Sequence, residues 1–321
     1  MKEGENVEDT LQAIKKEVKK VIVGQEELVD AMLIALLSGG HILVEGVPGL
    51  AKTTAINALA KALGLHFKRV QFTPDLLPAD VIGTEIYDQK NGEFKIKHGP
   101  IFTNLLLADE INRAPAKVQS ALLEAMQEKQ VTIGDESFML QPPFLVMATQ
   151  NPLEQEGTYR LPEAQLDRFL MKVIVGYNSF EEELEVVNRV VQRGFETIEK
   201  VADTQDIMRL QQQLSTIHID EALQKYMLQI IFATRSPKAF GLESLEPYIQ
   251  FGASPRASID LLKASKALAL IRGKDYVSPY DVAEVVAGVL RHRIILNYQA
   301  EAESISVDFI IQKIMQTIKV P

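Results

Sequence analysis

The stretch from Ile42 to Thr53 has the sequence ILVEGVPGLAKT, and it decides the fold class. Ile42–Glu45 predicts a strand, and the glycine-rich segment Gly46–Thr53 follows it directly. Apolar residues at helical spacing come next, so the order is strand, glycine-rich loop and helix. In this order the backbone N–H groups of the loop surround a phosphate at the N-terminus of a helix. We therefore expect an α/β fold with a phosphate-binding loop.

The residue types in the loop suit a nucleoside triphosphate. Lys52 is expected to reach the β and γ phosphates, and the Thr53 hydroxyl is expected to hold Mg²⁺. Ala51 stands where the strict pattern has glycine. We expect a helical φ at Ala51, because only a positive φ strictly demands glycine. The residues expected to bind nucleotide here are Gly46, Val47, Pro48, Gly49, Leu50, Ala51, Lys52, Thr53 and Thr54.

A second apolar run, Leu105–Ala108, ends in the acidic pair Asp109 and Glu110. Strands of a parallel sheet bring their last residues to the edge where ligands bind. Asp109 is expected to contact Mg²⁺, largely through water, and Glu110 to polarise the attacking water. An acidic pair at a strand end is common on protein surfaces. The combination with the loop is what indicates a hydrolytic site.

The remaining pattern predicts a parallel sheet followed by helices. Strands buried on both faces are expected at His41–Glu45, Phe67–Phe72, Asn104–Asp109, Phe144–Thr149 and Phe169–Val175. From Phe180 onward the apolar spacing is almost entirely helical, and Ser278-Pro279 with Asp281 is a helix start. We expect two units, an α/β domain at 1–178 and a helical domain at 179–321.

Composition limits the class of protein. The chain has 321 residues, a net charge of −9 and no cysteine, so disulfides and thiolate metal sites are excluded. No apolar run reaches the length of about 18 residues that a membrane helix needs. We expect a cytoplasmic protein without a membrane span. The acidic balance disfavours nucleic acid as a partner, because that binding uses clustered Lys and Arg.

Several motifs in sequence order give the chain a specific resemblance. Over nearly its whole length it resembles the MoxR family of AAA+ ATPases, in which alanine at the position of Ala51 is the usual form. The segments that carry the resemblance are Val23–Gln25, Gly46–Thr53, Asp109–Ala114, Ala148–Pro152, Leu161–Phe169 and Ser254–Arg256.

The resemblance implies an AAA+ core, with a five-stranded parallel sheet between helices, and a smaller C-terminal all-α lid. It also implies roles for residues outside the loop. Val23 and Gly24 would line the adenine pocket. Asn151 resembles sensor 1, which orients the lytic water, and Arg168 lies in the segment that resembles the arginine-finger motif. Such a finger acts on the γ-phosphate of the neighbouring subunit.

Arg256 resembles sensor 2 of this family. It follows Ser254 and Pro255, which predict the start of a helix. A cation in the first turn opposes the helix dipole, so its position suggests a bound anion. Two further segments, Thr73–His98 and Glu128–Leu140, resemble inserts that face the central pore in related rings. Each contains a hairpin pattern, with Asn91-Gly92 as the clearest turn.

The implied function is Mg²⁺-dependent ATP hydrolysis in a hexameric ring, coupled to remodelling or activation of a protein client. Many members of the family work with a von Willebrand factor A domain, which would here be a separate chain. Two alternatives stay open. A nucleotide-gated binding module would hold ATP with little turnover, although Glu110 disfavours it. A magnesium-chelatase-like subunit or nucleic-acid motor is disfavoured by the acidic balance.

Overall fold

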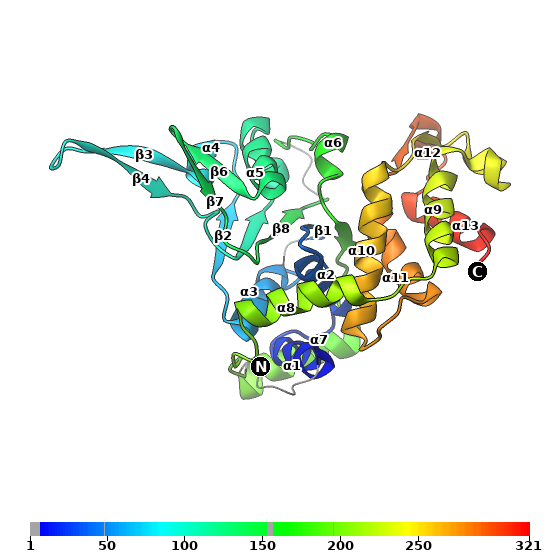
Figure 1. Cartoon of the computed structure of the whole chain (residues 1–321), viewed down its shortest axis with the longest axis horizontal. Coiled ribbons are helices and arrows are strands. Elements are labelled where there is room, and N and C mark those ends of the chain that lie inside the picture. The colour runs from blue at the N-terminus through cyan, green and yellow to red at the C-terminus, as the bar shows by residue number, and fades with distance from the viewer. Residues whose placement is uncertain (1–6, 48, 153–156, 195) are drawn as a thin grey trace.

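A five-stranded parallel sheet forms the centre of the structure (Figure 1). The computed structural model describes residues 7–47, 49–152, 157–194 and 196–321. The sheet has the strand order β2-β5-β8-β1-β9, and every neighbouring pair is parallel. Its strands are β1 (Ile42–Glu45), β2 (Phe67–Gln71), β5 (Leu105–Asp109), β8 (Leu145–Gln150) and β9 (Met171–Ile174). The five predicted strands are thus confirmed, with ends that differ by at most two residues. The expected burial on both faces is wrong for β2, because it is the edge strand and none of its residues is buried.

Alternate residues of the strands enter two separate apolar cores. Leu105 and Leu107 of β5 pack with the helices of one face, whereas Leu106 and Ala108 pack with those of the other. This two-sided burial follows from the pleat, since successive side chains point to opposite faces. The sheet therefore lies between two helical layers, as expected for strands that are apolar on both sides.

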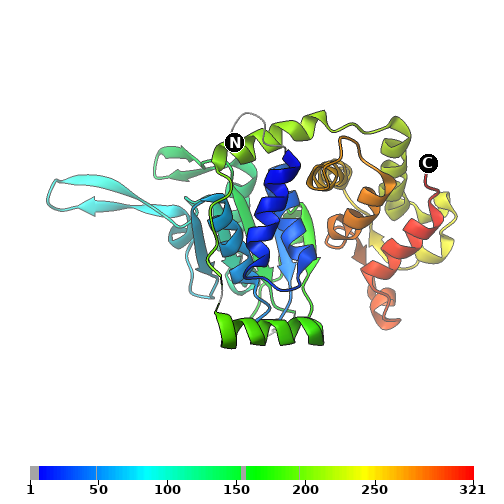
Figure 2. The same cartoon turned by 90° about the horizontal axis from the view of Figure 1, so that it is seen from below.

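The first face is covered by the N-terminal helices, which Figure 2 shows in front of the sheet. They are α1 (Val7–Lys19), α2 (Glu26–Ser38) and α3 (Lys52–Leu63). The second face is covered mainly by α5 (Ala116–Glu128), with α4 (Pro78–Ile82) beside it. A short helix, α6 (Glu163–Leu166), precedes β9.

Two antiparallel hairpins extend from the second face. The first pairs β3 (Gly83–Asp88) with β4 (Glu93–His98), and the second pairs β6 (Gln130–Ile133) with β7 (Glu136–Met139). The first hairpin projects away from the molecule in both views (Figures 1 and 2). Both hairpins lie where the sequence predicted them.

Residues 180–213 run back along the N-terminal helices. This segment contains α7 (Phe180–Asn188), a π-helical turn (Arg189–Arg193) and α8 (Thr204–Gln213). Arg189 donates to the carbonyl of Lys19 at 2.8 Å, and Gln211 donates to that of Leu36 at 2.6 Å. We propose that the division near residue 178 marks the end of the sheet domain, with this segment as the link to the helices that follow.

The C-terminal unit is a group of helices on the side of the sheet opposite the first hairpin (Figure 2). Its helices are α9 (Glu221–Arg235), α10 (Pro255–Ile271), α11 (Pro279–Leu290), α12 (Tyr298–Ala302) and α13 (Val307–Thr317). The predicted start of α11 is confirmed, with Ser278 as N-cap and Asp281 in a capping box. A short antiparallel pair, β10 (Ile249–Phe251) and β11 (Ile295–Leu296), adds strands that helical spacing did not predict.

In the described part of the chain, no helix is both long enough and apolar enough to span a membrane.

Candidate functional site

The glycine-rich loop connects the buried strand β1 to α3 at the carboxyl edge of the sheet. Gly46 is required by space, because a Cβ there would lie 2.7 Å from the carbonyl oxygen of Val175 in the neighbouring segment. Gly49 has φ 88°, which a side chain would strain. Pro48 lies outside the described residues. Glycine is therefore needed at position 46, where the loop passes close to the backbone of Val175, and at position 49, where the loop has a positive φ.

Ala51 corrects one of our expectations. Its φ is 54°, in the left-handed region, and not helical. The residue precedes α3 as its N-cap, where the chain turns into the helix. A left-handed conformation costs an L-residue roughly 1–2 kcal/mol, so the loop holds Ala51 in a conformation that glycine would adopt freely.

Lys52 is folded over the loop. Its Nζ donates to the carbonyl of Gly46 at 2.6 Å. Burial lowers the pKa of Lys52, and the charges of Asp109 and Glu110 oppose that shift. A partly desolvated cation gains from an anion placed beside it. Lys52 is therefore suited to phosphate oxygens at this position.

The two acidic residues lie at the end of β5 as predicted, and Thr149 of β8 contacts the carboxylate of Asp109 and the backbone of Glu110. The Thr149 hydroxyl donates to Asp109 Oδ1 at 2.6 Å and accepts from the backbone N–H of Glu110 at 2.8 Å. Glu110 has φ 55°, so its backbone is also left-handed. Asn151, buried after β8, lines the same cleft as these groups. The structure thus brings together Lys52, Asp109, Glu110 and Asn151.

Two residues of β2, Arg69 and Gln71, donate hydrogen bonds to the two carboxylates, and sequence reasoning missed both. Arg69 donates to Asp109 Oδ2 from Nε at 3.1 Å and from Nη2 at 2.6 Å. Gln71 donates to Glu110 Oε2 at 2.8 Å, and Arg113 Nη1 donates to the same oxygen at 3.1 Å. The available signal was polar residues in a strand predicted to be buried on both faces. These polar residues point to the site only once it is known that β2 pairs with β5, which carries Asp109.

One cleft of about 350 Å³ is lined by Lys52, Arg69, Gln71, Asp109, Glu110, Thr149 and Asn151, and also by Gly49, Thr53 and Thr54. Its size is at the lower end of the usual range for ligand sites. The Thr53 hydroxyl and the Asp109 carboxylate are hard oxygen donors of the kind that Mg²⁺ prefers, and Mg²⁺ typically takes few protein ligands beside phosphate. The cleft therefore fits a polyphosphate with Mg²⁺.

Val23 and Gly24 lie outside that cleft, against the chain between β9 and α7. The Val23 carbonyl accepts from Asn178 at 3.3 Å. A Cβ on Gly24 would lie 2.6 Å from Glu182 Oε1, and the φ of 67° also favours glycine. Their suggested contact with adenine remains a prediction, although they border the same edge of the sheet.

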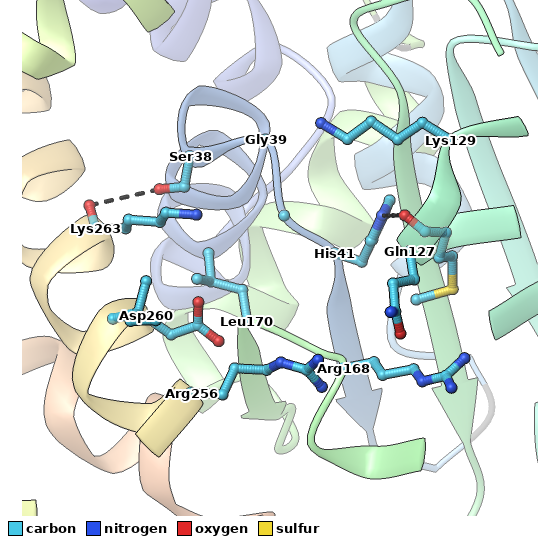
Figure 3. A pocket seen from close by; sticks show the side chains of 13 residues that line it. Ser38, Gly39, His41, Gln127, Lys129, Arg168, Leu170, Arg256, Asp260 and Lys263 are labelled. Atoms are coloured by element: carbon cyan, nitrogen blue, oxygen red, sulfur yellow. Dashed lines mark hydrogen bonds between the residues drawn. The ribbon is translucent and has the colours of Figure 1, made fainter. Parts of the chain in front are cut away.

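Arg168 and Arg256 line a second cavity, of about 320 Å³ (Figure 3). Arg168 follows α6, and Arg256 is in the first turn of α10, as predicted. The cavity includes His41, directly before β1, whereas the loop follows β1. One strand of four residues, about 13 Å at the usual rise, separates the two regions. The two arginines therefore lie together, but away from the loop of their own chain.

The second cavity is rich in positive charge. Lys129 and Lys263 line it with the two arginines, and Asp260 also lines it (Figure 3). Asp167 Oδ2 lies 3.7 Å from Arg256 Nη1. A cationic surface of this kind attracts an anionic group.

Comparison with known proteins shows the same two-part organisation. Residues 41–171 match the model of the ATPase family associated with various cellular activities (AAA), and residues 243–314 match that of the AAA lid domain. The chain is 52% identical over 312 residues to chaperone MoxR1 of Mycobacterium tuberculosis, covering 97% of this chain and 82% of that protein. It is 33% identical to protein MoxR of Paracoccus denitrificans, covering 94% and 93% of the two chains.

A solved structure is similar over the whole length. The crystal structure of a candidate ATPase from Cytophaga hutchinsonii superposes with a TM-score of 0.93 and 52% sequence identity, covering 98% of this chain and 96% of that one.

Proposed function

The chain belongs to the MoxR family of AAA+ ATPases, and from this premise we propose that it hydrolyses ATP with Mg²⁺ at sites shared between neighbouring subunits. The observation that carries the proposal is the separation within one chain. The loop, Asp109 and Glu110 line a cleft at one edge of the sheet, whereas Arg168 and Arg256 line a cavity beyond the opposite end of β1. Two copies in a head-to-tail contact would bring the two sets together.

Within the cleft, the proposed roles follow from the contacts. The loop and Lys52 bind the phosphates, and Thr53 with Asp109 holds Mg²⁺, which would neutralise charge on the phosphates. Glu110 accepts a proton from the attacking water, and Asn151 orients that water. In the structure Glu110 Oε2 accepts from Gln71 and Arg113, and these contacts orient the carboxylate.

Arg168 and Arg256 then act on the nucleotide of the neighbouring copy. Charge develops on the γ-phosphoryl oxygens in the transition state, and a cation supplied in trans is worth about 10³–10⁵ in rate. Closing the arrangement by rotation produces a ring, which we propose is hexameric.

The wider role is proposed from the relatives. A relative named as a chaperone supports remodelling or activation of a protein client. The family resemblance of the sequence is the ground on which we propose a separate von Willebrand factor A domain protein as the partner and the cytoplasm as the location. The exposed pair Tyr87 and Phe94 on the projecting hairpin, with ring centroids 5.2 Å apart, is a suitable contact for such a client.

Steady-state ATP hydrolysis across a protein dilution series tests the proposal. Turnover per subunit should depend on Mg²⁺ and rise with protein concentration. Glu110→Gln should bind ATP but lose about a hundredfold or more in turnover, because the base is absent. Arg168→Ala should lose about a thousandfold.

Arg160→Ala is the matched control, because this exposed arginine lies in the same segment but lines neither cavity. ATP binding without turnover at every concentration would favour the nucleotide-gated module. The bonds from Gln71 and Arg113 to Glu110 Oε2 support that alternative, because they compete with the attacking water for this carboxylate oxygen.

A further inference from the structure

Arg293 is a buried cation between the C-terminal helices and the segment that carries Arg168. It follows α11, and its side chain is 1% exposed. Nε donates to Asp167 Oδ1 at 2.8 Å. Nη2 donates to the carbonyl of Asp167 at 3.1 Å and to that of Phe169 at 2.8 Å, and Nη1 donates to that of Leu170 at 3.3 Å. One guanidinium thus holds the backbone on both sides of Arg168.

The same guanidinium also holds the C-terminal unit. Nη1 donates to the carbonyl of Val289 in α11 at 2.8 Å, and Nη2 donates to Asp260 of α10 at 2.5 Å. Arginine has five N–H donors in a rigid plane, and here they are distributed over two units of the protein. Lysine could keep the charge but not this distribution.

Asp167 extends the network to Arg256. Its carboxylate accepts from the hydroxyl of Ser254, the N-cap of α10, at 2.9 Å on both oxygens. Arg256 lies two residues farther on and is 3.7 Å from the same carboxylate. His292 adds a bond to the carbonyl of Phe169 at 2.9 Å. Arg168 and Arg256 are therefore each one or two residues from a group that this network fixes.

We propose that Arg293 is a positioning residue for the active site of the neighbouring subunit, because it sets the backbones of Arg168 and Arg256 relative to each other. The inference rests on the proposed action of these arginines in trans. Stability alone would not require the network, since well-packed apolar residues commonly replace buried ion pairs without loss. The network adjoins both Arg168 and Arg256, and we therefore explain it by the relative position that it gives these two arginines.

Mixed rings test this proposal, because they separate a subunit that supplies arginines from one that supplies a cleft. Arg168→Ala subunits keep the cleft, and Glu110→Gln subunits keep the arginines. Their mixture should regain turnover that neither has alone. Arg293→Gln alone should lose about tenfold or more in kcat, since small misplacements of catalytic groups have effects of that size, with its affinity for ATP unchanged.

The decisive results are the two mixtures of Arg293→Gln. Mixing with Glu110→Gln should restore turnover, because intact arginines then face the cleft of the Arg293→Gln subunit. Mixing with Arg168→Ala should not restore it, because neither subunit supplies positioned arginines. If Arg293→Gln subunits fold but regain turnover in neither mixture, their defect is not confined to the arginines that they supply, and that result overturns the inference.

Arg291→Gln is the matched control, because Arg291 lies two residues away and pairs with Asp308 at 2.7 Å and Glu27 at 3.4 Å, outside the network. It should keep the turnover of the parent protein. If Arg293→Gln does not fold, Arg293→Lys replaces it in the same mixtures. If Arg168→Ala and Glu110→Gln fail to complement each other, the action in trans is wrong. If those two variants complement each other, but Arg293 variants regain turnover with Arg168→Ala and not with Glu110→Gln, only the positioning role is wrong.

Discussion

Ala51 and Glu110 are left-handed in φ, at 54° and 55°, on the two sides of the nucleotide cleft. Non-glycine residues adopt this conformation at a cost of about 1–2 kcal/mol. Such strain tends to gather at functional sites, where the surrounding structure enforces it. At Glu110 the enforcing contact is the bond from its N–H to Thr149, which turns the side chain out of the strand and into the cleft.

At Ala51 the strain gives a prediction. Ala51→Gly removes the left-handed penalty of about 1–2 kcal/mol, while glycine loses about 0.4–1 kcal/mol through a more disordered unfolded state. We expect equal or slightly higher stability in urea unfolding, with turnover retained. Ala58→Gly, inside α3, is the control and should cost more than the roughly 1 kcal/mol of an exposed helix position, because the Ala58 methyl is buried in the core. A clear loss of stability in Ala51→Gly would contradict the left-handed assignment.

The sequence predicted the site residues whose chemistry is local. Lys52, Asp109 and Glu110 follow from loop and strand patterns, because each role depends on the position of a residue at the end of one element. Arg69 and Arg293 act across elements that are distant in the chain. Their roles depend on strand order and on the packing of α11, which no local pattern encodes.

Among the elements, β1 is anchored at its start by His41. Its Nδ1 accepts from the N–H of Val146 at 3.0 Å, and its Nε2 lies 3.2 Å from the carbonyl of Met126, to which it donates. The side chain thus ties β1 to β8 and to the end of α5. Sequence patterns predicted the two strands but neither α5 nor the bonds of His41, because a histidine before a strand has no distinctive spacing.

This anchor makes stability depend on pH. Burial lowers the pKa of His41 from 6.5 to about 4, and the nearby Lys129 acts in the same direction. The unfolded chain therefore binds a proton that the folded protein excludes between these values. The free energy of unfolding should fall as pH drops through 6.5 toward 4, by about 2 kcal/mol from this group at pH 5. Burial also lowers the pKa of His292, with the same sign.

Urea unfolding near pH 7.5 and near pH 5 measures the effect. His41→Asn keeps an acceptor for Val146 but cannot titrate, so it should be less stable at the higher pH and lose less on acidification. His66→Asn, at an exposed position, is the control for removal of an imidazole. An equal difference between parent and His41→Asn at both pH values would show that this histidine does not titrate on unfolding.

At the scale of the molecule, one apolar core joins the two units. The cluster that includes Ile56 of α3 and Leu33 of α2 continues without a break to Leu261 of α10 and Val289 of α11. The periodicity of the sequence indicated apolar faces on several helices, although Leu184, Val187 and Val191 of the segment after Phe180 are exposed. It did not indicate that the faces of two units meet, because an apolar helix face does not specify its partner.

This shared core predicts how the chain unfolds. A chain of this size with two units often unfolds in steps, but continuous burial and the Arg293 network should couple them. We expect one calorimetric transition, with equal calorimetric and van't Hoff enthalpies.

Gly288 of α11 faces Met171 of β9, where a Cβ would lie 2.6 Å from Met171 Cε. Gly288→Glu should therefore uncouple the units and give two transitions, whereas Ala283→Glu on the exposed side of α11 should keep one. Two transitions in the parent protein would mean that the lid is held by the nucleotide and not by its own packing.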